Sequence, residues 1–173
     1  NSCKKMVKFN HYSGFVNLAK LLFRIMIVRK AKKEDLKYIL EFQLAMAKET
    51  ENIELHLPTV EKGVAAVYND SSKGQYYVAE FDGRIVSSLL TTFEWSDWRN
   101  GTILWIQSVY VVPEFRRKGV YRSMYSHVKE LVLNDNKLNG IRLYADKSNL
   151  TAHKTYQNLG MSPDHYITFE WLK

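Results

Sequence analysis

The segment Arg116–Tyr121 places three consecutive basic residues and a glycine directly after a strongly apolar run. Arg116, Arg117 and Lys118 offer charge-assisted donors to an anion, and Gly119 lets a ligand approach the backbone closely. If a helix begins there, its first N–H groups are unpaired and its dipole is positive. This basic turn therefore predicts a diphosphate site. A solvated strand-to-helix turn is the alternative, because a single glycine is a weak signal.

A second set of polar and apolar residues follows the basic turn after roughly thirty residues, at helical spacing. Asn149 and Tyr156 lie two turns apart on one face of the predicted helix, and Gly160 ends it. A structural role for Tyr156, in which its ring packs and its hydroxyl only forms a hydrogen bond, is one alternative. Asn149 either binds a ligand or caps its helix.

Together, the two segments resemble the GCN5-related N-acetyltransferase (GNAT) superfamily. The first family motif, Arg/Gln-x-x-Gly-x-Gly/Ala after a strand, corresponds to Arg116, Gly119 and Tyr121. The second, Asn-x-x-Ala-x-x-x-Tyr-x-x-x-Gly-Phe, corresponds to the set Asn149, Ala152, Tyr156, Gly160 and Met161. The chain departs from the pattern where Tyr121 replaces a small residue of the first motif and where Met161 replaces Phe. The order of elements over 25–172 also matches the family.

The resemblance implies acetyl-CoA as the cofactor and direct attack of a primary amine on the thioester within a ternary complex. The pantetheine arm is expected between two splayed strands, Ile106–Val112 and Ile141–Ala145, with an N–H near Val111 donating to the thioester oxygen. The cofactor-binding residues implied in this way are Val109, Tyr110, Val111, Arg116, Arg117, Lys118, Gly119, Val120, Tyr121, Asn149, Ala152 and Tyr156.

The resemblance makes Tyr156 the general acid, and it leaves the base open. Some family members carry a Glu nine residues before the first motif residue, where this chain has Gln107, which can only hold a relaying water. Glu94 is the nearest acid in sequence that is expected to face the cleft. Glu49 and Glu51, at the end of the first helix, are further candidates. For all three carboxylates a solvated surface position is the alternative, and a neutral amine needs no base.

The tract Phe93–Asn100 combines two carboxylates with aromatic rings, and Trp105 follows shortly after it. Such a wall suits a cationic amine through cation–π contacts and ion pairs. A packed hairpin with a structural tryptophan pair is the alternative. The expected acceptor is a small-molecule or peptide amine.

Composition limits the function classes. The only cysteine among the 173 residues is Cys3, so an internal disulfide and a cysteine zinc site are excluded, no metal is expected, and a reducing, cytoplasmic setting is favoured.

The net charge is +7, but residues 1–33 hold nine basic and no acidic residues, and the remainder holds 16 basic and 18 acidic ones. The body is therefore nearly neutral, which argues against nucleic acid. A non-catalytic acyl-CoA-sensing or nucleic-acid-associated module with a basic N-terminal arm is the alternative class.

Residues 1–25 are expected to be an extension or remnant, and residues 26–173 one domain. The apolar run Leu21–Val28 contains Arg24 and is too short to span a membrane. A homodimer is left open.

Periodicity and turn residues predict the elements that must position these groups. Asp82-Gly83 marks a tight hairpin between two strands. The predicted strands are Ile25–Arg29, Gln75–Phe81, Arg84–Trp95, Thr102–Val112, Ile141–Ala145 and Tyr166–Leu172. The predicted helices begin near Lys33, Pro58, Gly119 and Asn149. We therefore expect a mixed α/β domain in which a central sheet combines an antiparallel meander with a splayed parallel pair, with helices on both faces.

Overall fold

The structure, a computed structural model, describes residues 26–164 and 167–171. The predicted extension over 1–25 lies outside the described residues, as do both ends of the predicted last strand. The elements are β1 (Met26–Lys30), η1 (Lys33–Asp35), α2 (Leu36–Glu51), α3 (Leu57–Asn69), β2 (Gln75–Phe81), β3 (Arg84–Ser96), β4 (Gly101–Val111), η2 (Pro113–Phe115), α4 (Val120–Asn134), β5 (Leu138–Arg142) and α5 (Leu150–Asn158).

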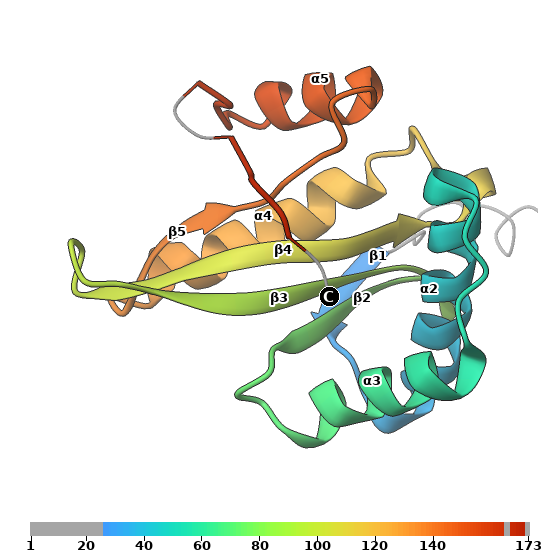
Figure 1. The fold of residues 1–173 in the computed structure, drawn as a ribbon. Coiled ribbons are helices and arrows are strands. Elements are labelled where there is room, and N and C mark those ends of the chain that lie inside the picture. Colours follow the sequence, from blue (N-terminus) through green and yellow to red (C-terminus); the bar gives the residue numbers. More distant parts are fainter. Residues whose placement is uncertain (1–25, 165–166, 172–173) are drawn as a thin grey trace, which may run out of the picture.

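The strands form one sheet in the order β1-β2-β3-β4-β5. The first four pair antiparallel to their neighbours, and β5 pairs parallel to β4 after the crossover through α4. Figure 1 shows the long β3–β4 hairpin at the centre of the molecule and α5 above it. This arrangement confirms the predicted fold class.

Helices cover both faces of the sheet. On one face the Ser87 hydroxyl donates to Met124 Sδ of α4, at 2.9 Å. The next strand residue, Ser88, lies opposite Tyr110, whose ring packs against Phe42 of α2 at 5.2 Å on the other face. Because neighbouring strand residues point to opposite faces, β3 is buried on both sides over Ile85–Thr91.

Two predicted strands differ from the structure. β5 begins and ends three residues earlier than predicted, because Leu138–Arg142 are the residues that pair with β4. The apolar residues Leu143–Ala145, which suggested the later position, lie beyond this pairing. No strand is assigned over 167–171, so the prediction of a last strand is wrong for these residues. They have no pairing partner among the described strands, and their apolar side chains are exposed.

A bulge interrupts the pairing of β4 with β3. Gln107 lies opposite Leu90, but Tyr110 lies opposite Ser88, so β4 contains one residue more than β3 over this stretch. Ser108 has a φ of 50°, which gives the bulge its left-handed residue. As a result, Gln107 and Tyr110 point to the same face although they are three residues apart.

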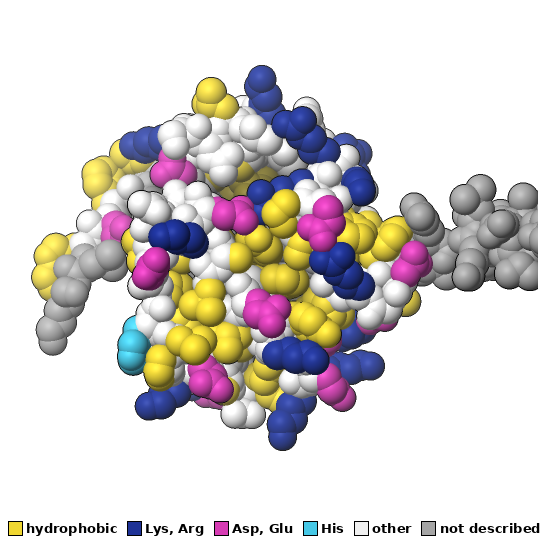
Figure 2. Space-filling view, turned by 90° about the vertical axis from the view of Figure 1, so that its right-hand side faces the viewer, with side chains coloured by type: hydrophobic (Ala, Val, Ile, Leu, Met, Phe, Trp, Pro, Cys, Tyr) yellow, Lys and Arg dark blue, Asp and Glu magenta, His cyan; other side chains and the backbone are white. Residues whose placement is uncertain are grey.

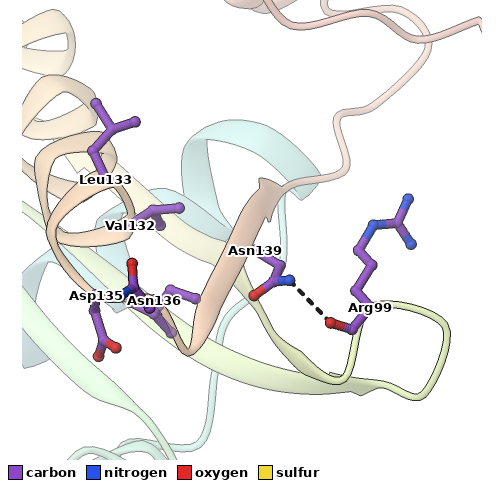
Figure 3. Close-up of a pocket in the computed structure, with 7 residues that line it drawn as sticks. Arg99, Val132, Leu133, Asp135, Asn136 and Asn139 are labelled. Carbon is purple, nitrogen blue, oxygen red and sulfur yellow. Dashed lines mark hydrogen bonds between the residues drawn. The ribbon is translucent and has the colours of Figure 1, made fainter.

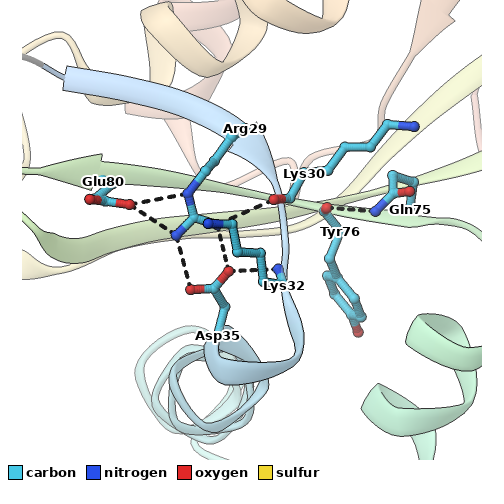
Figure 4. A network of polar contacts seen from close by, with 7 residues as sticks. All are labelled: Arg29, Lys30, Lys32, Asp35, Gln75, Tyr76 and Glu80. Atoms are coloured by element: carbon cyan, nitrogen blue, oxygen red, sulfur yellow. Dashed lines mark hydrogen bonds and ion pairs between the residues drawn. The ribbon is translucent and has the colours of Figure 1, made fainter.

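A buried carboxylate joins β1, η1 and β2 (Figure 4). Asp35 is buried and accepts from Arg29 Nη1 at 2.6 Å and from the Lys32 N–H at 2.7 Å. Arg29 Nη2 also donates to Glu80 on β2, at 2.9 Å. Burial by itself would raise the pKa of Asp35, but the bonds from Arg29 and Lys32 outweigh it and lower the pKa.

We predict that Asp35→Asn lowers the free energy of unfolding by about 2 kcal/mol at neutral pH, because charge-assisted bonds to Arg29 are lost. The folded-state pKa of Asp35 is lowered, so this contribution is present above the unfolded pKa and disappears as pH falls through the folded one. Urea unfolding at several pH values measures it. The wild-type protein should approach the variant in stability toward pH 3, and a constant gap down to that pH contradicts the assignment.

Candidate active site

The basic turn joins η2 to α4 in a strained backbone path. Arg117 has a φ of 60° and Gly119, the N-cap of α4, a φ of 81°. A Cβ added at Gly119 would meet no described atom within 4 Å, so the space beside this turn is open. The first N–H groups of α4 face that space without a side-chain cap, as an anion site requires.

Three cationic residues of the turn point in different ways. Arg116 points toward α2 and β4, where its Nη2 donates to Glu49 at 2.6 Å and its Nε donates to the Val111 carbonyl at 2.8 Å. Arg117 is exposed, and Lys118 lies over the ring of Phe115. Figure 2 shows several Lys and Arg side chains along the upper rim of this side of the molecule, with acidic, basic and apolar side chains interspersed below. The Arg116 side chain therefore contacts a carboxylate of α2 and a carbonyl of β4.

One edge of β4 is open beside the turn. The pairing of β4 with β5 ends where Trp105 lies opposite Arg142. The Val112 N–H donates to Val86 of β3 at 3.0 Å, so alternation directs the N–H of Val111 to the opposite edge. The two parallel strands thus diverge, as the family resemblance implied, and Val109–Val111 lie along the unpaired edge of β4.

A tyrosine cluster links α4 and α5. The ring of Tyr156 meets that of Tyr121 edge-on at 5.5 Å, and Tyr125 lies 6.4 Å from Tyr121. Burial raises the pKa of Tyr156, so its hydroxyl keeps its proton at neutral pH. The Tyr121 hydroxyl is buried and has no hydrogen-bond partner among the described residues. Tyr121, the departure from the family motif, therefore packs against the predicted acid.

Asn149 caps α5, since its Oδ1 accepts from the Ala152 N–H at 3.0 Å. This contact supports the capping alternative for Asn149. The cap fixes the start of α5, and Tyr156 lies near the far end of the same helix.

The carboxylate of Glu94 is fully engaged. It accepts from Trp105 Nε1 and from Arg142 Nη1, each at 2.5 Å. The bond from Trp105 is the main reason that the pKa of Glu94 is lowered, and Arg142 adds to it. A carboxylate held in this way is a weak base. Arg142 was missed by sequence reasoning because it comes from β5, 48 residues away.

The other acceptor-side residues are dispersed. Gln107 Nε2 donates to Thr92 Oγ1 at 2.8 Å, and the amide is thereby oriented on the α2 face. Trp95 and Trp98 are 65% and 88% exposed, which excludes a buried tryptophan pair in the hairpin. Glu51 is exposed as well.

A separate hollow of about 540 Å³ lies at the far end of α4 (Figure 3). Its lining contains none of the predicted site residues; Asn139 Nδ2 donates there to the Arg99 carbonyl at 3.2 Å. Across the described ranges, no group of His, Cys, Asp and Glu residues is placed to hold a metal ion. Each helix of the described part also falls short of the length and hydrophobicity that a membrane crossing requires.

A sheet whose parallel pair diverges next to a glycine-containing helix start is the architecture of a GNAT-type acetyltransferase. The sequence model of the acetyltransferase (GNAT) family matches residues 29–161. The chain belongs to this family of acetyl-CoA-dependent acetyltransferases.

Three relatives illustrate the similarity. An uncharacterized N-acetyltransferase of Methanocaldococcus jannaschii is 30% identical over 135 residues, which cover 78% of this chain and 77% of the relative. The crystal structure of a possible acetyltransferase from Clostridium difficile 630 is 40% identical, with a TM-score of 0.80, and covers 86% of this chain and 98% of its own. A predicted acetyltransferase with acetyl-CoA from Clostridium acetobutylicum is 19% identical, with a TM-score of 0.66 and coverage of 84% and 96%, and shares the fold.

We predict that Tyr121→Phe raises the free energy of unfolding by about 1 kcal/mol, because a buried hydroxyl without a partner is removed. Tyr110→Phe is the matched control: its hydroxyl donates to Glu49 at 2.8 Å, so the variant should lose about 1 kcal/mol. Thermal and urea unfolding measure both. Equal destabilisation by the two substitutions would show that Tyr121 has a partner.

Proposed function

We propose that the enzyme transfers an acetyl group from acetyl-CoA to a primary amine by direct attack within a ternary complex. The observation that carries the proposal is the open edge of β4 beside the uncapped start of α4. One supplies a backbone donor for a thioester, and the other supplies backbone donors for a diphosphate. The structural relative that contains acetyl-CoA supports the same donor.

The donor half of the site is assigned as follows. The pyrophosphate lies at the N–H groups around Gly119, Val120 and Tyr121, with Arg117 and Lys118 at its rim. The pantetheine arm lies along Val109–Val111. The Val111 N–H donates to the thioester oxygen and stabilises the negative charge that develops there during attack. Ala152 and Asn149 hold the helix that closes the other side.

The chemistry needs a proton for the departing sulfur. As the amine nitrogen attacks, a C–N bond forms, the thioester C–S bond breaks, and the sulfur leaves as a thiolate. Tyr156 donates its phenolic proton to that thiolate, and burial keeps the hydroxyl protonated until then. The surplus proton of the amine passes to water, and the Tyr156 phenolate regains a proton from the solvent before the next cycle.

The base is assigned to a water molecule held by Gln107, whose side chain is already oriented by Thr92. Glu94 is assigned a positioning role, since Trp105 and Arg142 occupy its oxygens. The wall formed by Glu94, Trp105 and Tyr144 then borders the acceptor, with the two rings 6.3 Å apart. Because Arg142 neutralises Glu94 and Arg116 neutralises Glu49, these two carboxylates give little preference for a cationic acceptor.

The lone cysteine supports a cytoplasmic setting.

Acetyl-CoA at a hundred times its dissociation constant should stabilise the fold by about 2.7 kcal/mol, measured as a rise in melting temperature. Gly119→Ala should weaken acetyl-CoA binding, because an alanine strains the left-handed backbone and its methyl group enters the ligand space. Gly83→Ala is the matched control, with a φ of 79° and equally open surroundings in the β2–β3 hairpin. No stabilisation of the wild-type protein by acetyl-CoA would refute the assigned donor.

Tyr156→Phe should lower turnover about a hundredfold while the dissociation constant for CoA stays nearly unchanged, because only the proton donor is removed. Single-turnover kinetics establish that chemistry is the limiting step, and calorimetry measures CoA binding. Tyr125→Phe, on the neighbouring helix, should leave turnover unaltered. The acid role is rejected if Tyr156→Phe turns over normally under these conditions.

A further inference from the structure

Glu49 lies in the last turn of α2, and both of its carboxylate oxygens contact the donor half of the site. Tyr110 Oη donates to Oε1 at 2.8 Å, and Arg116 Nη2 donates to Oε2 at 2.6 Å. These partners follow 61 and 67 residues later in the chain, on β4 and at the start of the basic turn. One side chain therefore connects a helix on the sheet face with both elements that border the proposed donor.

Three protein groups contact the Arg116 side chain. Besides Glu49, its Nε donates to the Val111 carbonyl at 2.8 Å, and its guanidinium lies over the Tyr110 ring, 5.4 Å from the centroid. The planar guanidinium suits this combination of carboxylate, carbonyl and aromatic contacts. Its side chain is thus directed at the open edge of β4 and away from the helix start.

The contacts contribute little to stability. The Glu49 and Arg116 side chains are 39% and 44% exposed, and solvent screens ion pairs at such exposure. Their consequence is geometric. They fix where the basic turn begins relative to β4, and they fix the carbonyl of the residue whose N–H is assigned to the thioester.

We propose that Glu49 is a positioning residue for the cofactor: through Arg116 it presets the basic turn so that its N–H groups meet the pyrophosphate. This inference rests on the proposed function. Glu49 does not touch the cofactor, and with both oxygens occupied it is not the base. Pre-organisation of this kind lowers the cost of binding, and a displacement of about 1 Å at a binding group can cost much affinity.

Glu49→Gln keeps the shape of the side chain and removes its charge, so the pair with Arg116 weakens. The expected result is a rise of about tenfold in the KM for acetyl-CoA and in the dissociation constant of CoA, with kcat nearly unchanged. Acetyl-pantetheine lacks the pyrophosphate, so kcat/KM with this donor should be the same for variant and wild type. Glu54→Gln is the control, since Glu54 pairs with Lys48 on the exposed surface nearby.

A double-mutant cycle tests the route through Arg116. Arg116→Gln should weaken CoA binding to a similar extent, and the double variant should bind no more weakly than either single one. Additive losses overturn the proposal. An equal loss with acetyl-CoA and acetyl-pantetheine overturns it, as does an unchanged affinity. Tighter CoA binding by Glu49→Gln also overturns it, because Arg116 would then be a phosphate ligand that Glu49 withholds.

Failure of the proposed function has a different signature. If the wild-type protein transfers acetyl from neither donor, the transfer reaction is rejected. The calorimetric comparison of CoA binding by the wild-type protein, the two single variants and the double variant then still decides the role of Glu49.

Discussion

Every buried N–H and C=O group of a sheet needs a partner, and β4 meets this requirement on both edges only as far as Trp105. Beyond that residue β5 no longer follows, and the last part of β4 presents backbone groups to a gap. One of these groups, the Val111 carbonyl, accepts a hydrogen bond from Arg116. What remains at this point is an N–H donor. This edge of β4 can therefore offer a hydrogen bond at Val111 to an acceptor atom, such as a carbonyl oxygen.

Three carboxylates in the described part of the chain join separate elements of the fold. Asp35 joins β1 to η1 and, through Arg29, to β2; Glu49 joins α2 to β4; and Glu94 joins β3 to β5. Each is paired with an arginine, whose fork can contact a second group at the same time. The site is consequently less acidic than its residue count suggests. Under the proposed function, the shape and hydrogen bonding of the acceptor amine then matter more than its net charge.

Local signals in the sequence were sufficient for most of the fold. The Asp82-Gly83 turn placed β2 and β3 almost to the residue, and the two motif segments placed the basic turn and Tyr156. Features that depend on distant partners were beyond such reasoning. Nothing in the type of Ser108 marks a bulge, since its cause lies in the pairing with β3. Arg142 reaches Glu94 of the candidate site because β5 runs beside β4. The sequence around Arg142 does not indicate this pairing.

The bulge also has a consequence for chain length. If β4 paired regularly, Tyr110 would lie opposite Ser87, its ring would turn toward α4, and the Val111 N–H would point at β3. The unpaired edge of β4 would then present the backbone groups of Tyr110 and Val112 in place of those of Val111. The one extra residue in β4 thus determines the sheet face to which every later side chain of the strand points. Among homologous chains, an insertion or deletion within β4 is tolerable where the bulge can absorb it, and sequence alignments should place such gaps at Ser108.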